Sequence, residues 1–364
     1  MNRDVERFET EAGGRIYRLP LEVFPGFWGY AHLVIGGGIN ALVDVGSGFG
    51  ESNEHLENGL AEVETRYGET VGWDELTHVL LTHGHIDHFG GLRYVQSRCG
   101  APVGVHELDY RVLTQYEERL AIVAVRLREY LLEAGVPEDE RTALMRLYLT
   151  NKELFESVEV DFTYQSVRGR VGPLEVIHVP GHCPGQVVLR YEDLLLTADH
   201  VLAGISPHQA PERLSLNTGL GHYLDSLRKL QPLAGEVRLA LGGHEGPIDD
   251  LAARLMSIEA LHLQRLRKIL GAATRPKTIN ELTGELFPEV EGYHELLALE
   301  ETGAHVEYLE QRGFLSIANA EEVENEGPCA IMYGRGVRPR DELEDTFADL
   351  EAGHPTGGDT DVRV

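Results

Sequence analysis

The chain has little cysteine and no long apolar run, and both shortages narrow its class. Its three cysteines lie far apart and have neither zinc-ligand nor redox spacing (Cys99, Cys183 and Cys329). A chain of 364 residues with so few cysteines predicts a reducing compartment. No stretch approaches the roughly 20 apolar residues of a membrane span, and the charged N-terminus lacks an apolar signal core. We therefore expect a soluble, cytoplasmic protein that makes no membrane contact.

Positive charge is also scarce. Lysine and arginine together number 32 against 60 acidic residues, which gives a net charge of −28. Phosphate contacts normally dominate the affinity of a protein for nucleic acid, and a chain this acidic repels phosphates at long range. We therefore expect no nucleic-acid partner.

Histidine, in contrast, is plentiful and concentrated. The segment His83-Gly84-His85-Ile86-Asp87-His88 holds four metal-ligating side chains and follows, after Thr82, the apolar run Val79-Leu80-Leu81. In an extended segment alternate residues face the same side, so His83 and His85 can reach one ion. Where the chain turns into a helix, Asp87 and His88 point elsewhere and can hold a second ion. Imidazole and carboxylate ligands suit zinc, iron or manganese.

Three further ligands stand alone, each just after a short apolar run bounded by glycine or proline: His182, Asp199 and His244. Such runs are typical of buried strands, so each ligand is expected at the carboxyl end of a strand. Ligands at strand ends converge on one edge of a sheet. The sequence thus predicts enough ligands for two metal ions.

The order HxHxDH, Pro-Gly-His, lone Asp and Gly-Gly-His resembles the metallo-β-lactamase-fold hydrolase superfamily over roughly residues 15–250. The resemblance implies an α/β fold, the four-layer αββα sandwich. It also implies one metal on His83, His85 and His182, and a second on Asp87, His88 and His244. Asp199 would bridge the two metals.

Two cations a few ångströms apart lower the pKa of a bridging water and stabilise negative charge in a transition state. Asp87 is the residue expected to orient that water and move its proton, which makes Asp87 and Asp199 the catalytic candidates. We predict a dinuclear metal-dependent hydrolase in which a bridging hydroxide attacks the carbonyl of a small thioester, lactone or ester. Zinc is the expected metal, with iron or manganese as alternatives.

Departures from the family pattern exclude some activities and leave others open. β-Lactamases of this fold do not use a bridging Asp at the position of Asp199, so antibiotic hydrolysis is not expected. Flavodiiron proteins usually carry Glu at the position of His85, so oxygen reduction of their kind is not expected. The alternatives are a phosphodiesterase or ribonuclease-like hydrolase, a mononuclear-iron sulfur dioxygenase and a non-catalytic scaffold.

Within the superfamily, the segments Thr197–Leu202 and Ile205–His208 resemble a subgroup related to hydroxyacylglutathione hydrolases and to β-lactamase-like protein 2, which carries a C-terminal winged helix. Glutathione thioesters themselves are not expected, because the C-terminal region here is acidic. Loops near a site often carry specificity. Placement beside the expected cleft therefore suggests four substrate contacts: His200, His208, His222 and Tyr223.

Length and pattern predict a catalytic domain over 1–254 with a helical insertion at about 107–157. A winged-helix domain is predicted over 255–335, and an acidic, loosely ordered tail over 336–364. The 255–335 region has seven Lys or Arg against fourteen Glu, so we expect it to pack on the hydrolase core or on a second subunit rather than to bind DNA. The insertion either shapes substrate entry or forms a homodimer contact.

Overall fold

The computed structural model describes residues 3–326 and 328–345, and the chain divides into two compact units. The first unit comprises Met1–Arg119, Phe155–Pro207 and Arg228–Arg254. The second comprises Leu120–Leu154, His208–Leu227 and Leu255–Val364. Both units are therefore assembled from separate stretches of the chain.

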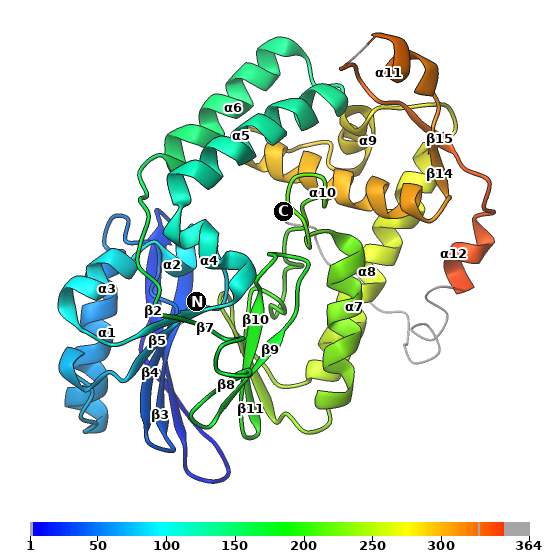
Figure 1. The fold of residues 1–364 in the computed structure, drawn as a ribbon. Helices are drawn as coiled ribbons and strands as arrows, with labels where there is room; N and C mark the ends of the chain where they lie inside the picture. Colours follow the sequence, from blue (N-terminus) through cyan, green and yellow to red (C-terminus); the bar gives the residue numbers. More distant parts are fainter. Residues whose placement is uncertain (1–2, 327, 346–364) are drawn as a thin grey trace. The chain divides into compact units, whose positions relative to one another are not determined.

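Seven strands form the first sheet of the first unit, and they lie in chain order (Figure 1). They are β1 (Glu6–Glu9), β2 (Arg15–Phe24), β3 (Phe27–Gly36), β4 (Ile39–Val43), β5 (His78–Leu80), β6 (Val103–Val105) and β7 (Phe162–Thr163). The strands β1 to β4 pair antiparallel, whereas β4 to β7 pair parallel. A two-residue hairpin loop joins β3 to β4: Gly36 pairs with Ile39, and Gly37 and Gly38 both have positive φ. Two positive φ angles in a two-residue loop favour glycine.

The second sheet has six strands in the order β13-β12-β11-β10-β9-β8. They are β8 (Arg170–Val171), β9 (Leu174–His178), β10 (Val187–Tyr191), β11 (Leu194–Ala198), β12 (Leu239–Gly242) and β13 (Pro247–Ile248). The strands β11 and β12 are fully buried, which explains why they read as continuous apolar runs. They pair parallel, so their carboxyl ends meet at the same edge.

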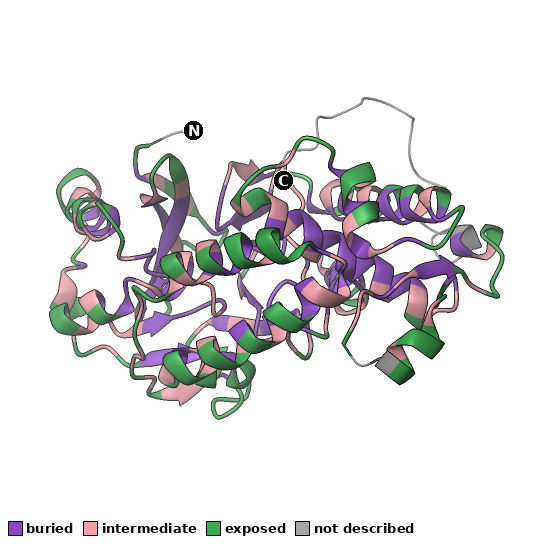
Figure 2. Ribbon diagram, turned by 90° about the horizontal axis from the view of Figure 1, so that it is seen from above, coloured by how far each residue is buried: buried purple, intermediate pink, exposed green. Residues whose placement is uncertain are grey.

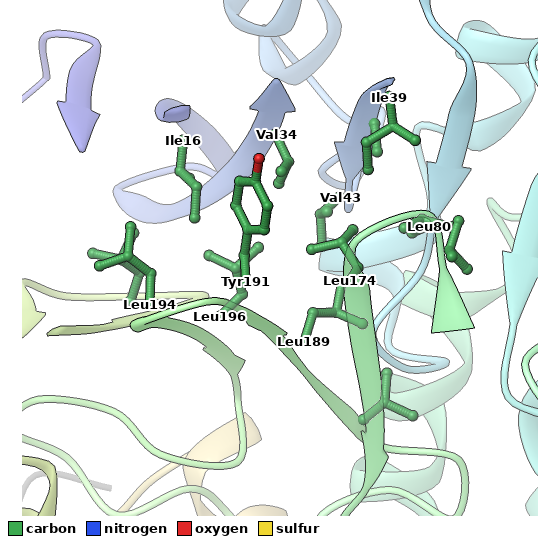
Figure 3. Close-up of a cluster of buried hydrophobic side chains, with 14 of the residues drawn as sticks. Ile16, Val34, Ile39, Val43, Leu80, Leu174, Leu189, Tyr191, Leu194 and Leu196 are labelled. Carbon is green, nitrogen blue, oxygen red and sulfur yellow. The ribbon is translucent and has the colours of Figure 1, made fainter. Parts of the chain in front are cut away.

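Side chains from both sheets form one hydrophobic core (Figure 3). Ile16, Val34 and Val43 come from the first sheet, and Leu189 and Leu196 from the second. Each aliphatic side chain of this kind contributes roughly 1.5–3 kcal/mol when it is fully buried. The predicted mixed α/β sandwich is therefore confirmed, and this core fixes the two sheets that carry the ligands.

Four helices belong to the first unit: α1 (Ser52–Tyr67), α2 (Ile86–Phe89), α3 (Leu92–Arg98) and α4 (Glu107–Thr114). The apolar face of α1 includes Leu56, Leu60 and Val63 and packs on β2. Its opposite face is exposed, in the pattern of an amphipathic helix. Helices with one buried face and one exposed face are visible in Figure 2.

Helices dominate the second unit. They are α5 (Tyr116–Glu133), α6 (Glu138–Lys152), α7 (Leu220–Leu230), α8 (Leu251–Ala272), α9 (Ile279–Leu286), α10 (Tyr293–Gln311), α11 (Ala320–Glu326) and α12 (Asp341–Asp345), and some begin or end in the first unit. Thr278 caps α9 through a capping box with Glu281. Most of α10 is buried, which makes it the central helix of this unit.

Two short strands, β14 (Leu315–Ile317) and β15 (Tyr333–Arg335), pair antiparallel after α10. The predicted region 255–335 thus contains helices and this two-stranded sheet, and its winged-helix assignment stays a prediction. Of the predicted tail, Asp341–Asp345 is helical and residues 346–364 lie outside the described part. Among the described residues, no helix is long and apolar enough to cross a membrane.

Candidate metal centre

The HxHxDH segment changes conformation in its middle, as the spacing predicted. It follows β5, and His85 is still extended, with φ −86° and ψ 144°. Helix α2 then begins at Ile86 and carries Asp87 and His88. Because the backbone conformation changes at this point, His83 and His85 point to one place and Asp87 and His88 to another.

The three lone ligands come from the second sheet. Asp199 directly follows β11, His244 lies two residues after β12, and His182 lies in the loop after β9. The parallel pairing of β11 and β12 brings Asp199 and His244 to one edge. The strand-end placement predicted from the apolar runs is therefore what the structure shows.

The seven predicted ligands gather into two clusters. The ligating atoms of His83, His85 and His182 lie within 4.8 Å of one another. The same separation holds for the second cluster, which consists of Asp87, His88, Asp199 and His244. Asp199 also reaches the first cluster, since its Oδ2 lies 4.0 Å from His182 Nε2 and 3.4 Å from His244 Nε2.

Asp44, at the end of β4, fixes the orientation of one imidazole in each cluster. Its Oδ2 accepts from His88 Nδ1 at 2.8 Å and from the Thr82 hydroxyl at 2.8 Å. Having donated its proton to Asp44, the Thr82 hydroxyl accepts from His83 Nδ1 at 3.0 Å. His83 and His88 therefore carry their protons on Nδ1, which leaves the Nε2 lone pairs for a metal.

His244 also donates from Nδ1, in this case to a backbone acceptor. Its Nδ1 donates to the carbonyl of Trp28 at 2.8 Å, so its Nε2 faces Asp87 and Asp199 at 3.3 and 3.4 Å. Trp28 lies at the start of β3, so the first sheet orients a ligand that the second sheet carries. An acceptor behind the imidazole is the usual support of a metal-ligating histidine.

Electrostatics in the second cluster favour a cation. Burial alone would lower the pKa of His88, but the carboxylates of Asp199 and Asp44 outweigh it and hold that pKa well above its usual value. The pKa of His244 rises to about 10 in spite of its burial, chiefly because of Asp199. Two carboxylates in a buried volume thus attract positive charge, which a divalent ion would also supply.

In the first cluster, His83 is neutral and has an open lone pair. Burial, with help from His88 and His85, lowers the pKa of His83 well below its usual value. His83 Nε2 is buried and has no hydrogen-bond partner among the described residues. A buried acceptor without a partner is costly unless something binds it. The donor set therefore fits a metal ion.

The predicted substrate contacts have different surroundings. His200 is fully buried beside Asp199 in the first unit, and its role stays a prediction. His208 and His222 lie in the second unit, where their Nε2 atoms pair with Glu300 at 2.9 Å and Glu212 at 3.2 Å. Tyr223 is fully buried and its ring packs on His262. The contact predicted for Tyr223 stays a prediction, as it does for His200.

A third group of histidines and a carboxylate lies in the second unit: His262, Glu301 and His305, all buried. His305 Nδ1 donates to the Glu301 carbonyl at 2.7 Å, so its Nε2 accepts from His262 Nδ1 at 3.0 Å. The Glu301 carboxylate accepts from Arg265 at 2.6 Å and from the Gln209 N–H at 2.8 Å. Sequence motifs gave no sign of this cluster.

The orienting residues Asp44 and Thr82 were not among the predicted site residues. The available signal was that Asp44 ends an apolar strand run, as Asp199 does. Its carboxylate binds Thr82, which directly precedes the motif, and His88, which ends it. Contacts of this kind depend on sheet pairing, and no spacing within the motif encodes them.

Paired clusters of His and Asp at the strand ends of an α/β sandwich fit a class of metal-dependent enzymes. Residues 27–272 match the family model of the "Metallo-beta-lactamase superfamily", and the chain belongs to this family. A Bacillus subtilis (strain 168) protein described as "Probable metallo-hydrolase YqjP" is 25% identical over 283 residues, which cover 74% of this chain and 84% of that protein.

Two solved structures resemble this chain over most of its length. A metallo-beta-lactamase family protein from Thermus thermophilus has a TM-score of 0.65 and 28% identity, and the match covers 88% of this chain and 98% of that one. A beta-lactamase domain protein from Burkholderia ambifaria has a TM-score of 0.64 and 22% identity, with 91% and 94% covered. The second likeness concerns the fold alone.

Proposed function

We propose that the chain is a dinuclear metal-dependent hydrolase that cleaves an activated acyl bond in a small thioester, lactone or ester. The observation that carries the proposal is the pair of ligand clusters with Asp199 within 4.0 Å of a histidine in each. Membership of a hydrolase superfamily supports the reaction type.

The donor set supports one ion on His83, His85 and His182 and a second on Asp87, His88 and His244. Asp199 would bridge them. These donors are nitrogen and oxygen without thiolate, a set that zinc accepts and that iron and manganese also accept. We propose zinc. Two divalent ions would supply Lewis acidity, which lowers the pKa of water and polarises the oxygen of the scissile bond.

Asp87 is the residue we propose for proton transfer. Its carboxylate lies 3.3 Å from His244 Nε2, and 16% of its side chain is exposed against 3% for His88. The exposed edge of Asp87 can therefore accept a proton from an attacking water and pass it to the leaving group. Asp44 and Thr82 would hold the imidazoles still while this occurs.

The surface beside the second cluster supports an acyl substrate. The Phe27 ring lies 4.6 Å from the His244 ring and is 43% exposed. Phe49 is also exposed, and its ring lies 6.2 Å from that of Phe24. An apolar rim of this kind suits an acyl chain, whereas the net charge of −28 opposes a polyanionic substrate.

The test combines metal analysis with a substrate panel of acyl thioesters, lactones, bis(p-nitrophenyl) phosphate and RNA. Wild type is compared with Asp199→Ala and His83→Ala. His78→Ala is the control, because this half-buried histidine on β5 contacts Thr77 and belongs to neither cluster.

We expect two metals per chain and acyl hydrolysis that both ligand variants lose and the control keeps. Turnover of the phosphodiesters alone would replace the acyl substrate with the phosphodiesterase alternative. One iron per chain, oxygen uptake and no hydrolysis would overturn the proposal in favour of a dioxygenase.

A further inference from the structure

Asp109 is a buried carboxylate that touches both loops of the first ligand cluster without belonging to it. It lies on α4 and is fully buried. Its Oδ2 accepts from the N–H of Gly84 at 2.8 Å, and its Oδ1 accepts from the N–H of Gly185 at 2.9 Å. Gly84 separates His83 from His85, and Gly185 lies three residues after His182.

Glycine at both contacts lets the backbone approach this carboxylate closely. A Cβ on Gly185 would lie 2.5 Å from Asp109 Cγ, a distance that would force the two apart. A Cβ on Gly84 would lie 3.1 Å from Val112 on the same helix and 3.4 Å from Asp109. The two glycines and the aspartate therefore form one closely packed contact.

Further contacts near this carboxylate connect the same two loops to each other and to α4. On the inner side, the Val187 N–H donates to the Thr82 carbonyl at 2.9 Å, which joins the two loops directly. On the outer side, His178 Nε2 donates to the Pro184 carbonyl at 2.8 Å. The His178 ring stacks on His106, the N-cap residue of α4, with centroids 3.8 Å apart. Helix α4 is thus tied to the His182 loop at two points.

From this geometry we infer that Asp109 is a positioning residue for the first metal pocket. Its carboxylate sets the separation of the Gly84 and Gly185 loops and so holds His83, His85 and His182 at the spacing of one ion. This inference rests on the proposed function, because it takes these three histidines to be metal ligands. Asp109 lies outside the HxHxDH motif and is not one of the three lone ligands.

The test measures the metal affinity of each pocket separately, with zinc and a chromophoric chelator as competitor. A His244→Ala background disables the second pocket, and a His182→Ala background disables the first. In the first background, Asp109→Asn is expected to weaken zinc binding by about 10- to 100-fold, the usual cost of losing an outer-shell contact. The substituted amide accepts one N–H but turns its own N–H₂ toward the other. In the His182→Ala background, Asp109→Asn is expected to leave the zinc affinity of the second pocket unchanged.

Two control variants separate positioning from general packing. Asp161→Asn also converts a carboxylate that accepts a backbone N–H, from Val103 at 2.7 Å, but binds neither loop. Val112→Ala removes a side chain of α4 beside Gly84 without removing a hydrogen bond. Both controls are expected to keep the zinc affinity of the first pocket and the visible spectrum of the cobalt(II)-substituted protein, which Asp109→Asn changes.

The outcomes distinguish this inference from the proposed function. If the His244→Ala protein binds no zinc, the proposed function fails and the inference fails with it. If that protein binds zinc and Asp109→Asn binds it equally well, the inference alone is overturned, even where the thermal stability of the variant falls. Should Asp109→Asn not fold, Gly185→Ala decides by the same measurement, since it displaces the carboxylate without altering its charge.

Discussion

The two units each contain buried histidines beside carboxylates, and the two arrangements differ in where the lone pairs point. In the first unit, the Nδ1 atoms of His83, His88 and His244 bond to Thr82, Asp44 and Trp28, so their Nε2 atoms are the ones that belong to the two ligand clusters. In the second unit, His305 Nε2 is already used by His262. The first arrangement presents donors to an ion, and the second is a closed hydrogen-bonded network.

Charge separates the two arrangements as well. The carboxylates of Asp87 and Asp199 face histidines, whereas the Glu301 carboxylate, which lies 3.6 Å from His305 Nδ1, is also paired with Arg265. Burial, with His305 and Arg265 adding to it, lowers the pKa of His262 well below its usual value, so the imidazole is neutral. A guanidinium beside the carboxylate opposes a second cation. Residue types alone therefore do not make a metal site; the direction of the donors and the balance of charge do.

The largest expected effect is the loss of the ion pair in the second unit. Glu301→Gln leaves Arg265 buried without its counter-charge, and we expect the free energy of unfolding to fall by about 3–5 kcal/mol. Denaturant unfolding measures this change. The metal content should stay the same, and a drop in the number of bound metals would mean that this cluster is a third metal site.

Acid should act on the second unit through His305. Burial lowers the pKa of His305 to about 4, so the unfolded chain binds a proton between about pH 6.5 and 4 that the folded chain does not. The contribution of this group is full above the unfolded pKa and is lost as the pH falls through this window, by about 3 kcal/mol in all.

We test this with unfolding curves of metal-free protein at several pH values, comparing wild type with His305→Gln. The variant should be less stable at neutral pH and show a shallower slope between pH 6.5 and 4. Equal slopes in the two proteins would contradict the assignment of a neutral, buried imidazole to His305.

Metal removal should destabilise the first arrangement and leave the second unaffected. A free metal concentration of 100 times Kd stabilises the folded state by about 2.7 kcal/mol per site, and a chelator removes that gain. Calorimetric Tm values with zinc and with chelator measure it. The gain should shrink in His83→Ala and persist in His262→Gln. If zinc no longer stabilised the His262→Gln protein, the metal would be bound by the second unit and not by the first.

The smallest expected effect comes from a matched pair of threonines. Thr82→Val removes the acceptor that fixes the tautomer of His83 and should weaken zinc binding about tenfold or more. Thr302 on α10 is equally buried, but its hydroxyl has no hydrogen-bond partner among the described residues. Thr302→Val should therefore leave zinc affinity unchanged and stability within about 0.5 kcal/mol. Chelator competition and denaturant unfolding check both, and equal zinc affinities in the two variants would contradict the role of Thr82.

The sequence by itself predicted the sandwich and the seven residues that gather into the two clusters. His83, His85, Asp87 and His88 share one short motif, and His182, Asp199 and His244 follow apolar runs. Local periodicity and strand-end placement encode both patterns, because a buried strand must be apolar and its end is where polar groups can begin.

Only the tertiary structure decided which residues support the ligands and which histidines are part of a closed network. Asp44 meets His88 across 44 positions, Asp109 meets Gly185 across 76, and His262 meets His305 across 43. The division into two units likewise joins Leu120–Leu154 with Leu255–Val364, which no linker composition marks. Such contacts depend on how sheets and helices pack. A hydrogen bond between residues distant in sequence needs only one donor and one acceptor, and it leaves no periodicity by which the sequence could reveal it.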